Sequence, residues 1–259
     1  MSTLATFNKS LFAGLCLCTA ALFTSFGIEK NFLSKQKSNS RVKTAYTDKE
    51  NKLAERLAPF HISLNNINIL ITAFKAEQQL VVYIKRPTEP RYQRFASYDI
   101  CSTSGMLGPK RQRGDGQVPE GFYYIDRFNP SSSFYLSLGL NYPNQADRIR
   151  AGKNDPGSDI FIHGSCVTIG CMPMTDELIK EIYILALQAH NSGQEKIPVY
   201  VFPFKFDGIN ADKFAARYKG DKAIQSFWSN LKRGYDSFKT TSRELKTSVN
   251  KNGEYMFNQ

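Results

Sequence analysis

Residues 161–174 read FIHGSCVTIGCMPM and join a strand-like run to the strongest helix pattern of the chain. The run at 159–163, DIFIH, is apolar in the manner of a buried strand, and Thr175 has the side chain of a helix cap. The stretch holds one His, two Cys and two Gly within fourteen residues. Since a turn between a strand and a helix exposes side chains and backbone N–H groups, we expect a reactive thiol here.

The residue types of this stretch suggest separate roles. His163 is the candidate base and Cys171 the candidate nucleophile. Gly170 lets the backbone approach a substrate closely, and the N–H groups around Gly170 and Cys171 are expected to hold an oxyanion. The positive end of the helix that begins at Thr175 is expected to lower the thiol pKa. Thr168 is expected to settle the loop through a hydroxyl hydrogen bond.

Three other interpretations of the same residues stay open at this point. His163, Cys166 and Cys171 have donor atoms for zinc, although a structural zinc site needs four ligands. Cys166 and Cys171 are candidates for a disulfide in an oxidising compartment. The residues are also compatible with a purely structural role, and a small buried hydrophobe is the default expectation for Cys166.

Outward from this stretch, β-branched runs separated by turn residues predict strands at 67–75, 80–85, 91–101, 122–126, 134–138, 159–163 and 198–204. The strongest helix pattern runs from Thr175 to Gly193. Weaker helical patterns lie at 47–58, 144–151, 211–218 and 222–231, and a polar tail follows the last of them. Because strands and helices do not alternate, we predict a mainly β, α+β fold that is mostly antiparallel, with one main helix after the active-site loop.

The N-terminal segment has the features of an export signal. Lys9 precedes the apolar run at 10–28, and small residues end that run. Residues 1–27 are therefore predicted to be a signal peptide or membrane anchor, which places the protein in the periplasm or cell envelope. Residues 28–64 are predicted to be a linker with a short helix.

The remaining domain prediction assigns residues 65–204 to the catalytic domain and 205–259 to a helical C-terminal extension. Cys101, Cys166 and Cys171 remain after the signal, too few for a disulfide scaffold in a chain of this length.

The composition excludes several protein classes. The 259 residues are 41% hydrophobic and 22% charged, which suits a packed globular protein rather than a disordered one. One long apolar run excludes a polytopic membrane protein. The net charge of +11 indicates anionic partners, but no nucleic-acid-binding motif is present, so no nucleic acid is expected.

Four short segments, taken in order, resemble the L,D-transpeptidase (YkuD-type) catalytic domain. They are STSG at 102–105, VPEGF at 118–122, IHG at 162–164 and TIGC at 168–171. GPK at 108–110 and GDGQVPEGFY at 114–123 are most similar to the YafK-like branch of that family.

Three features depart from the family pattern. Ile169 replaces the family's His, and Pro173 replaces an Arg associated with substrate positioning. The spacer between His163 and Cys171 is also shorter than in most members of the family.

The resemblance implies a cysteine acyl-transfer enzyme acting on peptidoglycan stem peptides. Cys171 would attack the carbonyl at the L-centre of meso-diaminopimelate, and His163 would move the protons. The acceptor would be an amine, which includes attachment of an envelope protein, or water, which makes the enzyme a hydrolase. The competing class is a non-catalytic wall-binding protein, which has no need of the Cys and His pair.

The substrate side of the prediction concerns the loop before Glu120. Its basic residues Lys110, Arg111 and Arg113 are candidates to pair with stem-peptide carboxylates. The alternative is that they belong to an ordinary solvated loop. Gly164 is a further candidate substrate contact. No metal or organic cofactor is expected, and the sequence leaves the oligomeric state undetermined.

Overall fold

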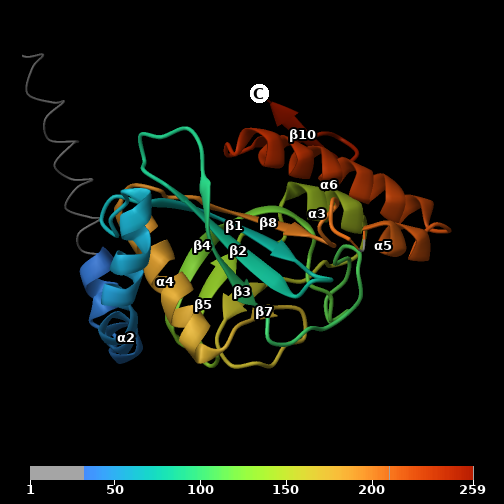
Figure 1. Cartoon of the computed structure of the whole chain (residues 1–259). Helices are drawn as coiled ribbons and strands as arrows, with labels where there is room; N and C mark the ends of the chain where they lie inside the picture. Colours follow the sequence, from blue (N-terminus) through green and yellow to red (C-terminus); the bar gives the residue numbers. More distant parts are fainter. Residues whose placement is uncertain (1–31, 210, 259) are drawn as a thin grey trace, which may run out of the picture.

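The computed structural model describes residues 32–209 and 211–258 of the chain, so the predicted signal segment lies outside the described residues. An eight-stranded sheet in the order β3-β2-β1-β8-β4-β5-β6-β7 forms the centre of the molecule, with helices on both faces (Figure 1). Five of the neighbouring pairs are antiparallel, whereas β1–β8 and β6–β7 are parallel. The predicted mostly antiparallel α+β fold is confirmed.

The strands form where the sequence predicts them, with some differences in length. Their bounds are β1 Asn68–Phe74, β2 Gln79–Lys85, β3 Gln93–Asp99, β4 Gly121–Ser132, β5 Tyr135–Leu140, β6 Phe161–His163, β7 Met172–Pro173 and β8 Ile197–Phe202. Within this sheet, the short strand β7, directly after Cys171, is the one that the sequence did not indicate, because two residues are too few to show a period.

Both faces of the central strands are buried, which explains why these strands are apolar along their whole length. In β1, Ile69 and Ile71 face one hydrophobic cluster, and Leu70 and Phe74 face the other. The first cluster lies under α2 (Ser40–Leu57) and α4 (Asp176–Asn191). The second lies under α6 (Lys222–Thr241) and its neighbours. The sheet is therefore the middle of three layers, as Figure 1 shows.

The N-terminal linker prediction was wrong. Residues 32–37 are helical and α2 begins at Ser40, capped by the Asn39 side chain, rather than at residue 47. Val42, Ala45 and Leu53 are fully buried, so one apolar face runs through a helix that is otherwise charged. None of the helices in the described residues is both long and apolar enough to cross a membrane.

The C-terminal extension contains more structure than the predicted polar tail. The extension begins with α5 (Ala211–Arg217) and continues with α6, which ends at Thr241. A hairpin of β9 (Lys246–Val249) and β10 (Tyr255–Asn258) follows. The short helix α3 (Gln145–Ala151) lies earlier in the chain, between β5 and β6. Phe202 of β8 packs against Tyr235 of α6 with ring centroids 5.3 Å apart. The extension thus shares a hydrophobic core with the sheet instead of forming a separate unit after residue 204.

The sheet curls so that its two edge strands meet. β3 and β7 are the first and last strands in sheet order, yet the Cys101 N–H after β3 donates to the Pro173 carbonyl of β7 at 3.0 Å. A disulfide between Cys101 and Cys166 joins the same two regions. The edge where the chemistry was predicted is therefore closed by the opposite edge of the sheet.

A buried ion pair fastens the long loop 102–120 to both the sheet and the extension. The Lys75 ammonium lies 3.0 Å from the fully buried Glu120 carboxylate, and it also donates to the carbonyls of Gly108 and Val118 at 2.8 Å. Glu120 in turn accepts the Gly108 N–H at 2.7 Å and the Trp228 indole N–H of α6 at 2.8 Å. Every polar group of this cluster is thus satisfied, which is what allows a charge to be buried here.

Replacing Glu120 by Ala should lower the free energy of unfolding by about 3–5 kcal/mol, because it leaves the Lys75 charge buried without a partner. Urea unfolding monitored by circular dichroism measures this loss. Asp236→Ala is the matched control, since it removes the exposed pair between Lys232 and Asp236 and should change stability by less than about 1 kcal/mol. Equal losses in the two variants would contradict the assignment of Glu120 as a structural hub.

Candidate active site

The predicted reactive stretch forms a loop held at both ends. At one end His163 ends β6, and the Met174 N–H donates to its carbonyl at 2.6 Å. At the other end α4 is capped by the Thr175 side chain, and Asp176 in its first turn accepts the Ser165 N–H at 2.9 Å. The loop is therefore tied to the start of α4 as well as to the sheet.

Cys171 lies half-buried at the end of this loop, immediately before β7. Its thiol donates to the Asp159 carbonyl, with Sγ and the oxygen 3.6 Å apart. Burial raises the pKa of the Cys171 thiol, and the Asp159 carboxylate adds to this effect. The expected lowering of the thiol pKa by the helix end is thus not what the structure shows. Burial outweighs a helix that begins several residues further along the chain.

His163 is almost fully buried, with 1% of its surface exposed. Its Nδ1 lies 2.5 Å from the Gly164 carbonyl oxygen. Because a carbonyl can only accept, Nδ1 carries the hydrogen, and the lone pair is on Nε2. The Phe134 ring packs on the imidazole, with ring centroids 4.7 Å apart. Burial lowers the pKa of His163, so the ring is neutral and able to accept a proton at neutral pH.

The strand register places these two side chains on one face of the sheet. Ile162 pairs with Met172 and His163 with Pro173 in parallel. Continued by one residue beyond the ladder, this register aligns Cys171 with Phe161, two residues before His163. From the ordinary spacings of a sheet, the two Cα atoms are diagonal neighbours ~8 Å apart. No hydrogen bond joins the thiol and the ring in the described structure, so the thiol must turn from Asp159 toward the ring before a proton passes.

Thr168 organises the turn before the thiol. Its hydroxyl oxygen accepts the N–H groups of Gly170 and Cys171 at 3.1 and 2.8 Å and donates to the Cys171 carbonyl at 2.9 Å. The two N–H groups expected to hold an oxyanion are thus engaged by Thr168 in this conformation. Gly170 has φ +134° and a Cβ there would lie 3.1 Å from the Gln117 carbonyl, so the close approach of the two loops requires glycine.

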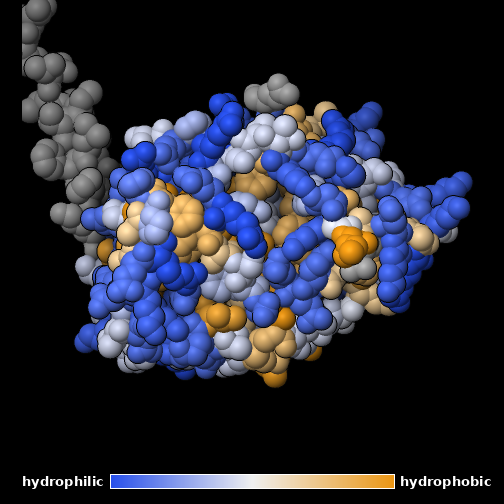
Figure 2. Space-filling view, in the orientation of Figure 1, coloured by the Kyte–Doolittle hydropathy of each residue, from blue (hydrophilic) through white to orange (hydrophobic). Residues whose placement is uncertain are grey.

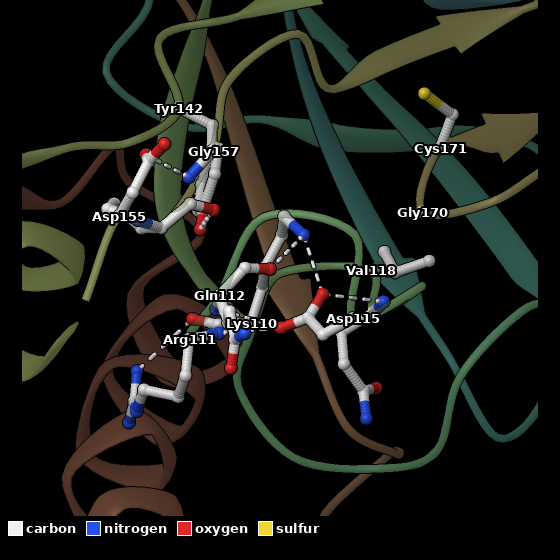
Figure 3. A network of polar contacts seen from close by, with 12 residues as sticks. Lys110, Arg111, Gln112, Asp115, Val118, Tyr142, Asp155, Gly157, Gly170 and Cys171 are labelled. Atoms are coloured by element: carbon white, nitrogen blue, oxygen red, sulfur yellow. Dashed lines mark hydrogen bonds and ion pairs between the residues drawn. The ribbon is translucent and has the colours of Figure 1, made fainter.

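The basic residues predicted to bind substrate contact groups of the protein itself, and Figure 3 shows Lys110 and Arg111 among these groups. Lys110 is buried and its ammonium lies 2.6 Å from the Asp115 carboxylate. Arg113 pairs with Asp155 at 2.7 Å, and Arg111 lies over the Phe227 ring, 5.5 Å from its centroid. None of the three is among the residues that line the pocket beside Cys171. Lys110 and Arg113 are thus paired with carboxylates of the protein itself, and a contact of the three basic residues with substrate stays a prediction.

Gly164 is surrounded by other parts of the protein and does not line the pocket beside Cys171. It is buried, and a Cβ there would lie 3.0 Å from the Phe134 carbonyl and 2.5 Å from Asp176 Oδ1. Its own carbonyl orients His163. Gly164 therefore positions the candidate base, which is a different task from the predicted contact with substrate.

Cys166 is exposed and bonded to Cys101, so it is not the small buried hydrophobe that was expected. With its sulfur in that bond, it is available neither for a disulfide with Cys171 nor as a zinc ligand beside His163. Within residues 32–209 and 211–258, no group of three or more His, Cys, Asp or Glu side chains is arranged to hold a metal ion.

A pocket of about 310 Å³ opens beside Cys171. The stretch 102–107 forms one wall, and Val118 and Met172 contribute apolar surface. Sequence reasoning missed two of its residues, Arg217 and Tyr218 at the end of α5, because nothing in the local pattern relates position 217 to position 171.

Apolar side chains are exposed on the two loops that border this pocket. Met106 is 62% exposed, Val167 58% and Ile169 90%. The face of the molecule seen in Figure 2 is mostly hydrophilic, with small hydrophobic patches between charged side chains. The loops around the thiol are therefore more apolar at their tips than most of that surface.

The rate of Cys171 alkylation by iodoacetamide should keep rising above pH ~8.5, the ordinary value for a thiol, because burial raises its pKa. The measurement follows adduct formation by mass spectrometry across the pH range, with Cys171→Ser as the blank. A rate that levels off near pH 7 would show a thiolate stabilised at neutral pH and would contradict this assignment.

Comparison with known proteins agrees with the motifs. The profile of the L,D-transpeptidase catalytic domain (YkuD) matches residues 68–201. The chain is 37% identical over 190 residues to the L,D-transpeptidase-family protein YafK of Escherichia coli K12, and equally to that of strain O157:H7, with 73% of each chain covered.

Solved structures with a similar arrangement are more distant. The helical cell shape determining protein Pgp2 of Campylobacter jejuni matches with a TM-score of 0.42 and 19% identity, covering 71% of this chain and 73% of that one. Bd1075 of Bdellovibrio bacteriovorus matches with a TM-score of 0.37 and 18% identity over 70% and 74% of the two chains. On the profile match and the YafK identity, the chain belongs to the L,D-transpeptidase catalytic-domain (YkuD) family.

Proposed function

We propose that this protein is a cysteine acyl-transfer enzyme that acts on peptidoglycan stem peptides. The observation that carries the proposal is the pairing of a pocket-lining thiol, Cys171, with a buried imidazole on the neighbouring strand whose Nε2 is free of hydrogen. Membership of the family supports the substrate class. A protein that only bound the wall would need neither a thiol nor an oriented imidazole at this place.

The proposed reaction begins when Nε2 of His163 takes the proton of the Cys171 thiol as Sγ attacks the carbonyl at the L-centre of meso-diaminopimelate. The tetrahedral intermediate collapses, and the imidazolium gives its proton to the amine of the departing residue. This leaves a thioester on Sγ. An acceptor amine or water, deprotonated by Nε2, then attacks the thioester and releases the product and the thiol.

The shifts of the two pKa values define the resting state of the pair. Burial raises the pKa of the thiol and lowers that of the imidazole, so both groups are neutral before substrate binds. The proton therefore moves during the attack rather than before it. The Gly164 carbonyl opposes this shift of His163, because its hydrogen bond with Nδ1 becomes stronger when the ring is charged.

Cys171→Ala should abolish turnover of purified tetrapeptide muropeptides, because the remaining groups cannot form a thioester. His163→Ala should lower the rate by about 10²–10⁴-fold, the usual scale of general-base catalysis. Mass spectrometry of the products measures both, and it separates transfer, which adds an amine acceptor, from hydrolysis. The acidic limb of the wild-type rate profile should lie below pH ~6.5, because the pKa of His163 is lowered.

Two results would oppose the mechanism. The first is full activity in Cys171→Ala, and the second is loss of wild-type activity only when a chelator is added. Asp236→Ala, which alters an exposed ion pair on α6, is the control for nonspecific loss of activity.

We further propose that the protein is exported to the periplasm or cell envelope. Lys9 and the apolar run at 10–28 have the pattern of a signal or anchor. The Cys101–Cys166 disulfide supports the proposal, because such bonds persist mainly in oxidising compartments.

Cell fractionation should find the protein outside the cytoplasm, with Cys101 and Cys166 protected from alkylation unless a reductant is added. Deleting residues 1–27 should leave the chain in the cytoplasm with both thiols reactive. A full-length chain that stays soluble in the cytoplasm would refute the export proposal.

A further inference from the structure

The C-terminal extension supplies part of the wall of the pocket that contains the candidate nucleophile. Arg217 and Tyr218, at the end of α5, line the same pocket as Cys171 and the loop residues Ser104 and Met106. The pocket therefore joins three segments that are far apart in the sequence.

Arg217 is the cation of this wall that has no carboxylate partner in the described structure. Lys75 is the other basic residue in the lining, but it is paired with Glu120 and bonded to the Gly108 and Val118 carbonyls. The Arg217 side chain is exposed, and its contact within the described part of the chain is the Tyr218 ring, 6.0 Å from its guanidinium carbon.

The position of Arg217 is fixed by aromatic contacts rather than left to a loose loop. Phe214 stacks on Phe204 with ring centroids 5.3 Å apart, and Tyr218 packs edge-on against Trp228 at 4.9 Å. Trp228 is itself bonded to the buried Glu120 carboxylate. The same cluster that fixes the loop 102–120 therefore sets Arg217 beside the pocket.

A second group in the pocket wall also lacks a partner. The Ser104 hydroxyl oxygen is buried and forms no hydrogen bond, although Ser104 lines the pocket. Buried hydroxyls are nearly always hydrogen-bonded, so a ligand that reaches this oxygen after a rotation of the Ser104 side chain would supply the missing partner. A hydroxyl and a guanidinium together are donors that suit a carboxylate.

We propose that Arg217 binds a free carboxylate of the substrate in the Cys171 pocket, with the Ser104 hydroxyl as a second donor. The identity of that substrate rests on the proposed function. A stem peptide offers two such carboxylates near the attacked bond, one at the D-centre of diaminopimelate and one at the C-terminus of the departing residue. Arg217 is in this view a binding residue that acts on affinity, since it contacts the substrate away from the bond that breaks.

The test measures binding of a tetrapeptide muropeptide to the Cys171→Ala protein by isothermal titration calorimetry, where no turnover occurs. Adding Arg217→Gln should weaken binding by about tenfold, the scale of one charge-assisted hydrogen bond. Arg217→Lys should lie between the two, because it keeps the charge and loses the forked geometry. Lys213→Gln removes a charge from the exposed face of the same helix outside the pocket, and it should leave the affinity unchanged.

Amidated muropeptides identify which carboxylate is bound. The peptide amidated at the bound carboxylate should have the same affinity for the protein that retains Arg217 and for the Arg217→Gln variant, whereas the other amide should keep the tenfold difference. Equal effects of Arg217→Gln and Lys213→Gln on the unmodified peptide would overturn the proposal. So would a tenfold difference that survives both amidations.

The test of the carboxylate site can fail or succeed independently of the test of the proposed function. Wild-type protein that shows no turnover while Arg217→Gln still weakens binding would refute the enzyme and support the carboxylate site. Turnover in the wild type with no change in KM for Arg217→Gln would refute the carboxylate site alone.

Discussion

The meeting of the two sheet edges at Cys101 is the constraint on which the candidate active site depends. An open sheet would leave β6 and β7 as an exposed edge, with the thiol at the margin of the molecule. Instead the Cys101 N–H bonds to the Pro173 carbonyl, and its sulfur bonds to Cys166 in the loop that carries Cys171. The pocket exists because the loop that follows β3 is brought over the end of β7.

This closure also sets the electrostatics of the site. A thiol at an open edge would be solvated, and the nearby helix start would then be the main influence on its pKa. Burial raises the pKa of the Cys171 thiol and lowers that of the His163 imidazole. The pair is therefore suited to moving a proton within a covered site rather than to holding a permanent thiolate.

The sequence predicted the parts of this site that are local and missed the parts that depend on long-range contacts. His163, Thr168 and Cys171 belong to one stretch, so their residue types and spacing could be interpreted together. Cys101 and Cys166 are 65 positions apart, and no periodicity relates them. The direction of the shift in the thiol pKa was predicted wrongly for the same reason, since the burial of Cys171 depends on the loop that covers this residue.

The fold shows the same division. Strands such as β1 and β8 were predictable because β-branched runs with turns on either side have few alternatives. Helix α2 was partly missed because its buried residues, Val42 and Ala45 among them, are sparse in a charged segment. The ion pairs of Lys110 with Asp115 and of Arg113 with Asp155 could not be predicted, because charge alone does not reveal which partner a basic residue has.

The C-terminal extension is best understood as part of the unit that forms the candidate active site. A segment that only decorated the domain could be separated from it without disturbing the site. Here Trp228 donates to Glu120, and Glu120 pairs with Lys75, a residue that itself lines the pocket. Removing α6 would leave the buried Glu120 carboxylate short of a donor and expose the aromatic face of β8. The shape of the pocket beside Cys171 is therefore determined as much by residues after position 204 as by the motifs that identify the family.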